Sequence, residues 1–357
     1  MIVHTLLIRA DGGTQMGTGH LMRCLALAQG WQEAGGEVLF VLAWEMPAIE
    51  ERLWQEGMQV AHLVGVVAGS EADAAATAVL ANQHHARWVV VDGYHFHSAY
   101  QKQIKEAGFS LLFIDDNAHA DHYYADLVLN QNIYAQAHLY QAREPYTRLL
   151  LGTSFALLRR EFWPWRGWQR PMLEVASHLL VTLGGSDPDN VTLKVIQALQ
   201  QLSGDWEAVI VVGGQNPHYQ ELVTAVGNDP RFQLRQNVPN MPELMAWADL
   251  AVSAGGSSIW ELAFMGVPTL LVTLADNQSE AVNTLAQNGI CLKLDQNRTL
   301  TLARVKEYLE SVLKDSAQRA LMHKRARDLV DGYGVVRIVN NMQSADLEEQ
   351  HESIEGC

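Results

Sequence analysis

The chain has 357 residues, of which 48% are hydrophobic and 18% charged, and its formal net charge at pH 7 is −15. This length exceeds the size at which a single hydrophobic core usually stops growing, so we expect two domains. So acidic a protein would be repelled by a nucleic-acid duplex, which argues against nucleic acid as the main partner. The tail from Ser344 to Cys357 is acidic and holds no Lys or Arg, and we expect it to be a solvated, poorly ordered end.

The cysteines and the first residues bear on the compartment. Cys24, Cys291 and Cys357 form no CxxC pair, and we expect the first two to be buried as small hydrophobic side chains. The N-terminus lacks a basic segment followed by an apolar one, and no apolar run approaches 18 residues. We therefore expect a cytoplasmic protein without a membrane span.

Short apolar runs rich in β-branched residues alternate with amphipathic patterns along the chain. In the first half, strands are expected at 5–9, 38–43, 60–63, 88–92, 111–115 and 127–129, with helices near 20–34, 47–56, 71–83 and 97–107. In the second half, strands are expected at 178–183, 208–212, 232–235, 250–253, 269–273 and 291–294, with helices near 190–202, 217–227, 240–247, 257–265, 277–288 and 300–313. Continuous apolar strands are typical of a parallel sheet buried on both faces. The alternation predicts an α/β protein of two Rossmann-like domains built from right-handed βαβ units.

A segment rich in tryptophan and proline, 161–171, interrupts this alternation and is expected to pack as a hinge. We place an N-terminal domain at 1–165, a second domain at 172–335, and a helix end with the acidic tail at 336–357. In open parallel sheets, ligands bind beyond the carboxyl ends of the strands. We therefore expect functional residues in strand-to-helix loops, with the two sheets facing a central cleft.

The first such loop is glycine-rich and leads into a helix that begins near His20. Gly17 and Gly19 allow close approach of a ligand, and the helix start favours an anion. The positive end of the helix disfavours imidazolium, so His20 is expected to stay neutral and act as a base. The alternative is a structural glycine turn with His20 as a cap. Arg23 either contacts a phosphate or pairs with an acidic neighbour. The loop does not match the GxGxxG dinucleotide fingerprint, so we expect no nicotinamide cofactor.

Two loops of the second half pair glycine with small polar residues. Gly184, Gly185 and Ser186 follow one expected strand, and Asn190 is the expected N-cap of the next helix. A second loop follows the strand at 250–253, and its backbone N–H groups and hydroxyls suit a diphosphate; it consists of Gly255, Gly256, Ser257 and Ser258.

Acidic and amide side chains follow the strand expected at 250–253 and the next one, at 269–273. Glu261 either accepts the hydroxyls of a ribose or closes a capping box with Ser258. Asp276, Asn277 and Gln278 suit hydrogen bonds to the hydroxyl or acylamino groups of a sugar, with helix capping as the alternative.

Weaker candidates lie in the first half. Strand ends there carry Asp92, Tyr94 and His95, and then the run 115–117. A further group has side chains of metal-ligand type but no recognisable spacing, so a solvated loop is the stronger interpretation; it consists of His119, Asp121, His122 and Asp126.

Five segments in a fixed order carry a family resemblance: IRADGGTQMGTGHLMRC, LLGTSFALLRREF, VTLGGSDPDN, SAGGSSIWELAFMGVPTLLVTLADNQ and DGYGVVRI. They resemble the PseG family of UDP-sugar hydrolases and, more distantly, the MurG-type glycosyltransferases of the GT-B fold. The resemblance covers about residues 8–338. It implies release of UDP from UDP-2,4-diacetamido-2,4,6-trideoxy-β-L-altropyranose, a step of pseudaminic acid biosynthesis. It also implies that water attacks the anomeric carbon with C–O cleavage and inversion, and that neither a metal nor another cofactor takes part.

The resemblance also implies roles for particular residues. His20 corresponds to the base that activates water, and Tyr94 to an active-site tyrosine. The 255–258 loop with Glu261 corresponds to the uridine and diphosphate site, and 275–278 to the sugar-side loop. The alternative is a MurG-like glycosyltransferase with the same UDP-sugar donor. The first half shows no Lys/Arg cluster for an anionic lipid acceptor, which favours the hydrolase. The expected partner is thus a small-molecule UDP-sugar.

Overall fold

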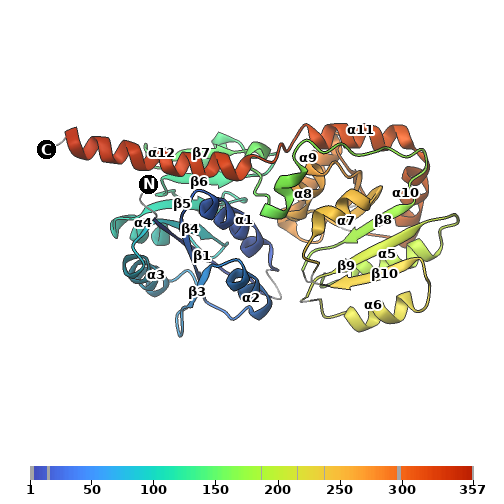
Figure 1. Ribbon diagram of the computed structural model, residues 1–357, viewed down its shortest axis with the longest axis horizontal. Coiled ribbons are helices and arrows are strands. Elements are labelled where there is room, and N and C mark those ends of the chain that lie inside the picture. Colours follow the sequence, from blue (N-terminus) through green and yellow to red (C-terminus); the bar gives the residue numbers. More distant parts are fainter. Residues whose placement is uncertain are drawn as a thin grey trace. The chain divides into compact units, whose positions relative to one another are not determined.

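The computed structural model describes residues 4–13, 17–185, 187–214, 216–236, 238–295 and 299–355, with side chains of the last helix as far as Asp346. The chain forms two compact units. The first consists of Met1–Gly13, His20–Arg160 and Gly332–Cys357, and the second of Thr14–Gly19 and Glu161–Asp331. Each is an α/β unit built on a parallel sheet (Figure 1).

The first unit contains, among its described residues, a seven-stranded sheet with the order β3-β2-β1-β4-β5-β6-β7. Its strands are β1 Thr5–Ala10, β2 Glu37–Leu42, β3 Gln59–His62, β4 Ala86–Asp92, β5 Ser110–Ile114, β6 Leu127–Asn130 and β7 Arg148–Leu151. Its helices are α1 Gly19–Glu33, α2 Pro47–Gln55, α3 Glu71–Gln83, α4 Ser98–Glu106 and α12 Gly334–Glu355, with 3-10 helices η1 Ala137–Tyr140 and η2 Thr153–Phe155. The 3-10 helix η3 Arg160–Trp165 leads into the second unit.

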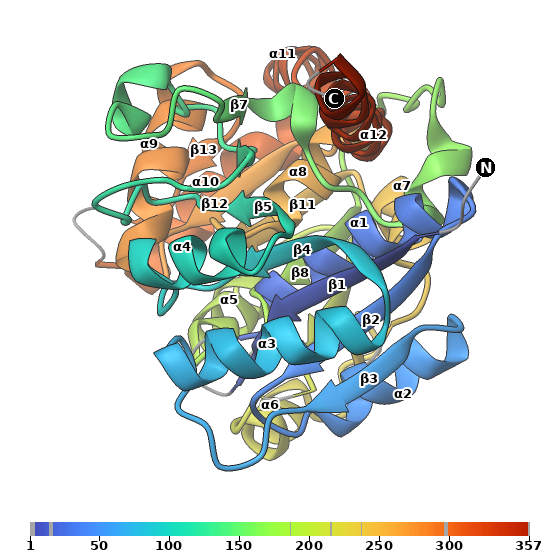
Figure 2. The same cartoon turned by 90° about the vertical axis from the view of Figure 1, so that its left-hand side faces the viewer.

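The central strands of the first unit's sheet are buried, as their continuous apolar sequences predict. Every residue of β1 is buried between its parallel neighbours β2 and β4. On one face, Leu7 and Val89 share a core with Ala74 of α3 and Ile104 of α4. Figure 2 shows α3 and α4 side by side over this face, with α1 on the other. The parallel pairing of these strands, with helices between them in the chain, matches the βαβ units expected from the sequence.

The second unit holds a six-stranded parallel sheet in the part that the structure describes, with the order β10-β9-β8-β11-β12-β13. Its strands are β8 His178–Thr182, β9 Glu207–Val212, β10 Phe232–Gln236, β11 Leu250–Ala254, β12 Thr269–Val272 and β13 Leu292–Lys293. Its helices are α5 Val191–Gln200, α6 Tyr219–Val226, α7 Met241–Trp247, α8 Ser258–Phe264, α9 Ser279–Gln287, α10 Leu302–Lys314 and α11 Ser316–Arg327, with the 3-10 helix η4 Asp276–Gln278.

Both sheets reverse their strand order next to their first strand. In the first unit the reversal lies between β1 and β4, and in the second between β8 and β11. The loops that follow two such strands diverge to opposite faces, which leaves room for a ligand beyond the strand ends. The glycine loops that follow β1, β8 and β11 are therefore where this topology favours binding.

The C-terminal tail differs from the sequence-based expectation. We expected a poorly ordered end from Ser344 onward. This expectation is wrong, because the backbone remains helical and α12 continues to Glu355. Asp346 Oδ1 accepts hydrogen bonds from Arg87 Nε at 2.9 Å and Trp88 Nε1 at 3.1 Å. These bonds attach the start of the tail to β4 of the first unit.

Two observations bear on the cysteines and on membranes. Cys24 and Cys291 are buried, as predicted, and burial raises the pKa of the Cys291 thiol to about 12. Across the described ranges, no helix is both long and apolar enough to cross a membrane.

Candidate active site

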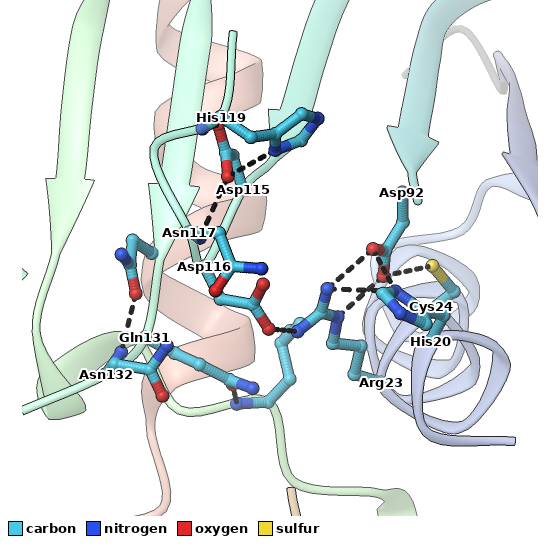
Figure 3. Close-up of polar contacts among 12 residues, drawn as sticks. His20, Arg23, Cys24, Asp92, Asp115, Asp116, Asn117, His119, Gln131 and Asn132 are labelled. Carbon is cyan, nitrogen blue, oxygen red and sulfur yellow. Dashed lines mark hydrogen bonds and ion pairs between the residues drawn. The ribbon is translucent and has the colours of Figure 1, made fainter. Parts of the chain in front are cut away.

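His20 and Asp92 form a buried pair at the carboxyl edge of the first sheet (Figure 3). His20 lies in the first turn of α1, and Asp92 ends β4. The His20 Nδ1 atom lies 2.6 Å from Asp92 Oδ1, and the two residues are 6% and 0% exposed. An ionised carboxylate only accepts hydrogen bonds, so Nδ1 carries the proton and Nε2 keeps the lone pair of the neutral ring. An imidazole oriented by a carboxylate in this way is able to act as a general base.

Arg23 holds the same carboxylate one turn further along α1. Its Nε donates to Asp92 Oδ2 and its Nη2 to Asp92 Oδ1, each at 2.6 Å, and its Nη1 donates to Asp116 Oδ2 at 2.7 Å. Nη2 also lies 3.0 Å from His20 Nδ1, because both groups donate to one oxygen. Of the two interpretations left open by the sequence, the structure shows the pairing with acidic neighbours.

The charge on Asp92 is set by these neighbours. Burial alone would raise the pKa of its carboxyl, but Arg23 and then His20 more than offset burial, and the pKa lies well below its usual range. The Cys24 thiol donates to Asp92 Oδ2 at 3.4 Å, and burial followed by the charge of Asp92 raises its pKa well above the ordinary value. Cys24 therefore stays a thiol and is no candidate nucleophile.

Tyr94 lies against the imidazole of His20. The two ring centroids are 4.9 Å apart with the rings nearly perpendicular, and the Tyr94 ring is 6.0 Å from that of His119. The structure thus brings the two predicted catalytic residues together.

The side chains of metal-ligand type in the loop after β5 each have a separate partner. His119 pairs with Asp115, Asp121 accepts from Ser98, His122 pairs with Glu144, and Asp126 with Lys105. Within the described residues, no group of three or more His, Cys, Asp and Glu is placed to hold a metal ion.

His119 gives a pH dependence that can be measured. Burial alone would lower its pKa, but hydrogen bonding to Asp115 and the charge of that carboxylate raise it. A raised folded pKa stabilises the protein below the unfolded value near 6.5, and this contribution is lost as the pH rises through the folded pKa. We expect the difference in unfolding free energy between the wild type and His119→Asn to be larger at pH 5.5 than at pH 9. Urea unfolding at both values measures it, and a difference independent of pH contradicts the assignment.

In the second unit, the loop after β8 is capped differently from the prediction. Asn190 has a left-handed conformation, with φ +48°, and makes no side-chain capping bond. Asp187 caps α5 instead, because its oxygens accept from the backbone N–H of Val191 at 2.9 Å and of Thr192 at 2.8 Å. Asn190 is turned toward Glu221. Asn190 thus occupies the predicted N-cap position, but the side chain that caps the helix is that of Asp187.

The glycines of this loop fall at the end of β8. Gly184 has φ +84°, which favours glycine, and a Cβ on Gly213 would lie 2.1 Å from the carbonyl oxygen of Gly185. Ser186 lies outside the described residues. The loops after β8 and β9 thus touch through their backbones.

The loops after β11 and β12 also pack together. A Cβ on Gly255 would lie 2.4 Å from Val282 and 3.0 Å from Gln278, so glycine is required there. Gly256 is open by comparison, since the nearest atom to its built Cβ is Gln278 Nε2 at 3.9 Å. Gln278 is fixed because its Oε1 accepts from the Leu274 N–H at 3.0 Å. Asp276 and Asn277 lie beside Gln278 in η4.

The predicted capping box of α8 is wrong in its register. Ser257 occupies the N-cap position, and its side chain makes no capping bond. Ser258 is the first helical residue, and Glu261 lies in the first turn.

The predicted site residues therefore form two groups. His20, Arg23 and Tyr94 belong to the first unit, while Gly17 and Gly19 group with the loops of the second. Gly17 has φ +74°.

Comparisons with known proteins place this geometry in a wider context. Residues 178–341 match the model of the glycosyltransferase family 28 C-terminal domain. The spore coat polysaccharide biosynthesis protein SpsG of Bacillus subtilis is 25% identical, with 96% of this chain and 98% of that protein covered. The UDP-2,4-diacetamido-2,4,6-trideoxy-β-L-altropyranose hydrolase of Campylobacter jejuni is 24% identical, with 80% and 97% covered. The crystal structure of MurG from Acinetobacter baumannii has a TM-score of 0.63 at 16% identity and covers 96% of this chain. The fold is GT-B-like.

Sequence reasoning gave too little weight to two acidic residues of the GT-B-like fold. Asp92 was a weak candidate, and Asp116 was part of a run noted only for its place after a strand. The available signal was position, because Asp92 ends β4 and Asp116 follows the neighbouring parallel strand β5. Their pairing with Arg23 was not predictable from spacing in the sequence.

Proposed function

We propose that this protein is a hydrolase that releases UDP from UDP-2,4-diacetamido-2,4,6-trideoxy-β-L-altropyranose, a step of pseudaminic acid biosynthesis. The observation that carries the proposal is the His20–Asp92 pair, which leaves Nε2 of a neutral imidazole as a base. The name of the Campylobacter jejuni relative, which this chain matches over most of its length, supports the choice of substrate.

In the proposed reaction, the His20–Asp92 pair activates water. His20 Nε2 takes a proton from water, and the water oxygen forms a bond to the anomeric carbon from the face opposite the diphosphate. The bond between that carbon and the diphosphate oxygen breaks, UDP leaves with the electron pair, and the configuration is inverted. Asp92 stabilises the imidazolium as it forms. Arg23 then acts as a positioning residue, because it fixes Asp92.

The second unit supplies the nucleotide site in this proposal. The backbone N–H groups of the glycine loops offset the growing charge of the UDP leaving group, without a metal or cofactor. These loops contain Gly17, Gly19, Gly184, Gly185, Ser186, Gly255, Gly256, Ser257 and Ser258. Glu261 accepts the ribose hydroxyls, and Asp276, Asn277 and Gln278 bind the sugar. Tyr94 contributes to the reacting site beside His20.

A glycosyltransferase is the second candidate, and the match to a glycosyltransferase domain over 178–341 favours it. There, His20 deprotonates an acceptor hydroxyl in place of water. The donor site is unchanged, so the two candidates differ only in the nucleophile.

Incubation of the purified protein with the UDP-sugar and no acceptor decides between them. We expect stoichiometric release of UDP and free sugar, measured by chromatography. In ¹⁸O-labelled water the label should enter the sugar, because the bond to carbon is the one that breaks. Strict dependence on an added acceptor contradicts the hydrolase, and label in UDP contradicts C–O cleavage.

A further inference from the structure

Trp44 and His95 lie together at the carboxyl edge of the first sheet. Trp44 follows β2 and His95 follows β4, and their ring centroids are 6.2 Å apart at an interplanar angle of 69°. Trp44 is 48% exposed, and the His95 side chain is 21% exposed. An indole ring held beside a partly open imidazole offers an apolar surface next to a polar atom.

Asp11 faces one nitrogen of the His95 ring. The His95 Nε2 atom lies 3.2 Å from Asp11 Oδ2, which is also 2.7 Å from Arg9 Nη1, and Asp11 Oδ1 accepts from the Ala43 N–H at 2.8 Å. Burial alone would raise the pKa of Asp11, but His95 and then Arg9 lower it to about 2. The nearby anion favours the tautomer of His95 that has its proton on Nε2, and in that tautomer Nδ1 is a hydrogen-bond acceptor.

The backbone around His95 is also fixed. Gly69 lies in the loop after β3, and a Cβ there would be 2.1 Å from the carbonyl oxygen of His95. The backbones of the two loops are therefore in close contact, and only glycine fits at position 69. Tyr94, the preceding residue, contacts His20. The loop after β4 thus carries both His95 and Tyr94, the residue whose ring contacts the candidate base His20 on α1.

We propose that Trp44 and His95 form a subsite for an N-acylamino group of the sugar, and this proposal rests on the proposed function. An acylamino group combines an N–H donor with an acyl methyl group. His95 Nδ1 accepts the N–H, and the exposed indole of Trp44 packs on the methyl. A hydroxyl substituent cannot fill the apolar half of this subsite. Trp44 and His95 are specificity residues here, and His20 remains the base.

The test uses Trp44→Ala and His95→Leu in the full chain, with steady-state hydrolysis of the diacetamido UDP-sugar. We expect KM to rise about tenfold in each variant, because one buried polar or apolar contact is lost, while kcat changes less than about threefold. UDP affinity should stay unchanged. His95→Gln keeps a donor for Asp11 and an acceptor for the ligand, so it should restore most of the affinity.

Matched controls are Trp54→Ala on α2, where the tryptophan is 57% exposed, and His97→Leu at the start of α4. Both should leave KM unchanged. Retention of the wild-type KM by Trp44→Ala and His95→Leu overturns the subsite.

Binding by calorimetry separates failure of the subsite from failure of the proposed function. UDP-N-acetylglucosamine and UDP-glucose serve as probes, since they differ by one acylamino group. We expect His95→Leu to weaken binding of the first but not of the second. Equal weakening of both overturns the subsite even if hydrolysis is observed. The subsite is also overturned if the wild type hydrolyses the diacetamido UDP-sugar but binds the two probes with equal affinity. If the wild type neither hydrolyses nor binds UDP-sugars, both proposals are overturned.

Discussion

Replacement of His20 by alanine is expected to lower kcat by about 10²–10⁴-fold, the usual contribution of a general base, while UDP binds with unchanged affinity. The reason is geometric, since Asp92 orients the His20 ring against Tyr94. The other imidazole near Tyr94 is that of His119, and both of its nitrogens already have partners, Asp115 Oδ1 and the Phe96 carbonyl oxygen. Single-turnover hydrolysis and calorimetric titration of UDP measure the two quantities separately.

A second variant tests the role of the carboxylate. Asp92→Asn replaces an acceptor with an amide that can donate to Nδ1, which favours the tautomer with its proton on Nε2. A ring in that tautomer cannot take a proton from water, so kcat should fall by a similar factor. His84→Ala, at the end of α3, is the control and should retain full activity. Full activity in His20→Ala would make His20 structural and end the proposed mechanism.

The positions of the loops were predictable from the sequence. Apolar strands that alternate with helices imply a parallel sheet, and a parallel sheet places its functional loops at one edge. His20 and the glycine loops after β8 and β11 were found in this way. The sequence could not show which acidic residue meets His20, because Asp92 lies 72 residues away and many strands end in a carboxylate.

Local rules failed where tertiary contacts override them. Asn190 directly precedes α5 and is a preferred N-cap residue, but its left-handed backbone turns its side chain to Glu221 and Asp187 takes its place. Helix α11 has little apolar periodicity and was not expected. It is held instead by buried Arg319, which donates to the carbonyl oxygens of Val312, Leu313, Leu173 and Glu174.

Arg9 is the second residue from which a large effect is expected. It lies within β1, among apolar neighbours, and is fully buried. Its Nε and Nη2 donate to the two oxygens of Asp73 at 3.0 and 2.8 Å, and its Nη1 lies 2.7 Å from Asp11. Burial alone would lower its pKa, but these two carboxylates raise it above the ordinary value. One guanidinium therefore pairs with two carboxylates that are themselves buried.

Arg9→Met should lower the unfolding free energy of the first unit by about 3–5 kcal/mol, the usual effect of removing one partner from a buried ion pair. The methionine fills most of the volume, so the loss comes from the two carboxylates left without a cation. Arg52→Met on α2 is the control, because Arg52 is partly exposed and its pair with Glu56 should contribute less than about 1 kcal/mol. Urea unfolding of both variants gives the comparison. Adding Asp73→Asn to Arg9→Met should recover part of the loss, because the amide removes one buried charge. A loss below about 1 kcal/mol in Arg9→Met would mean that water reaches Asp11 and Asp73, which would also weaken the assignment of the Nε2 proton on His95.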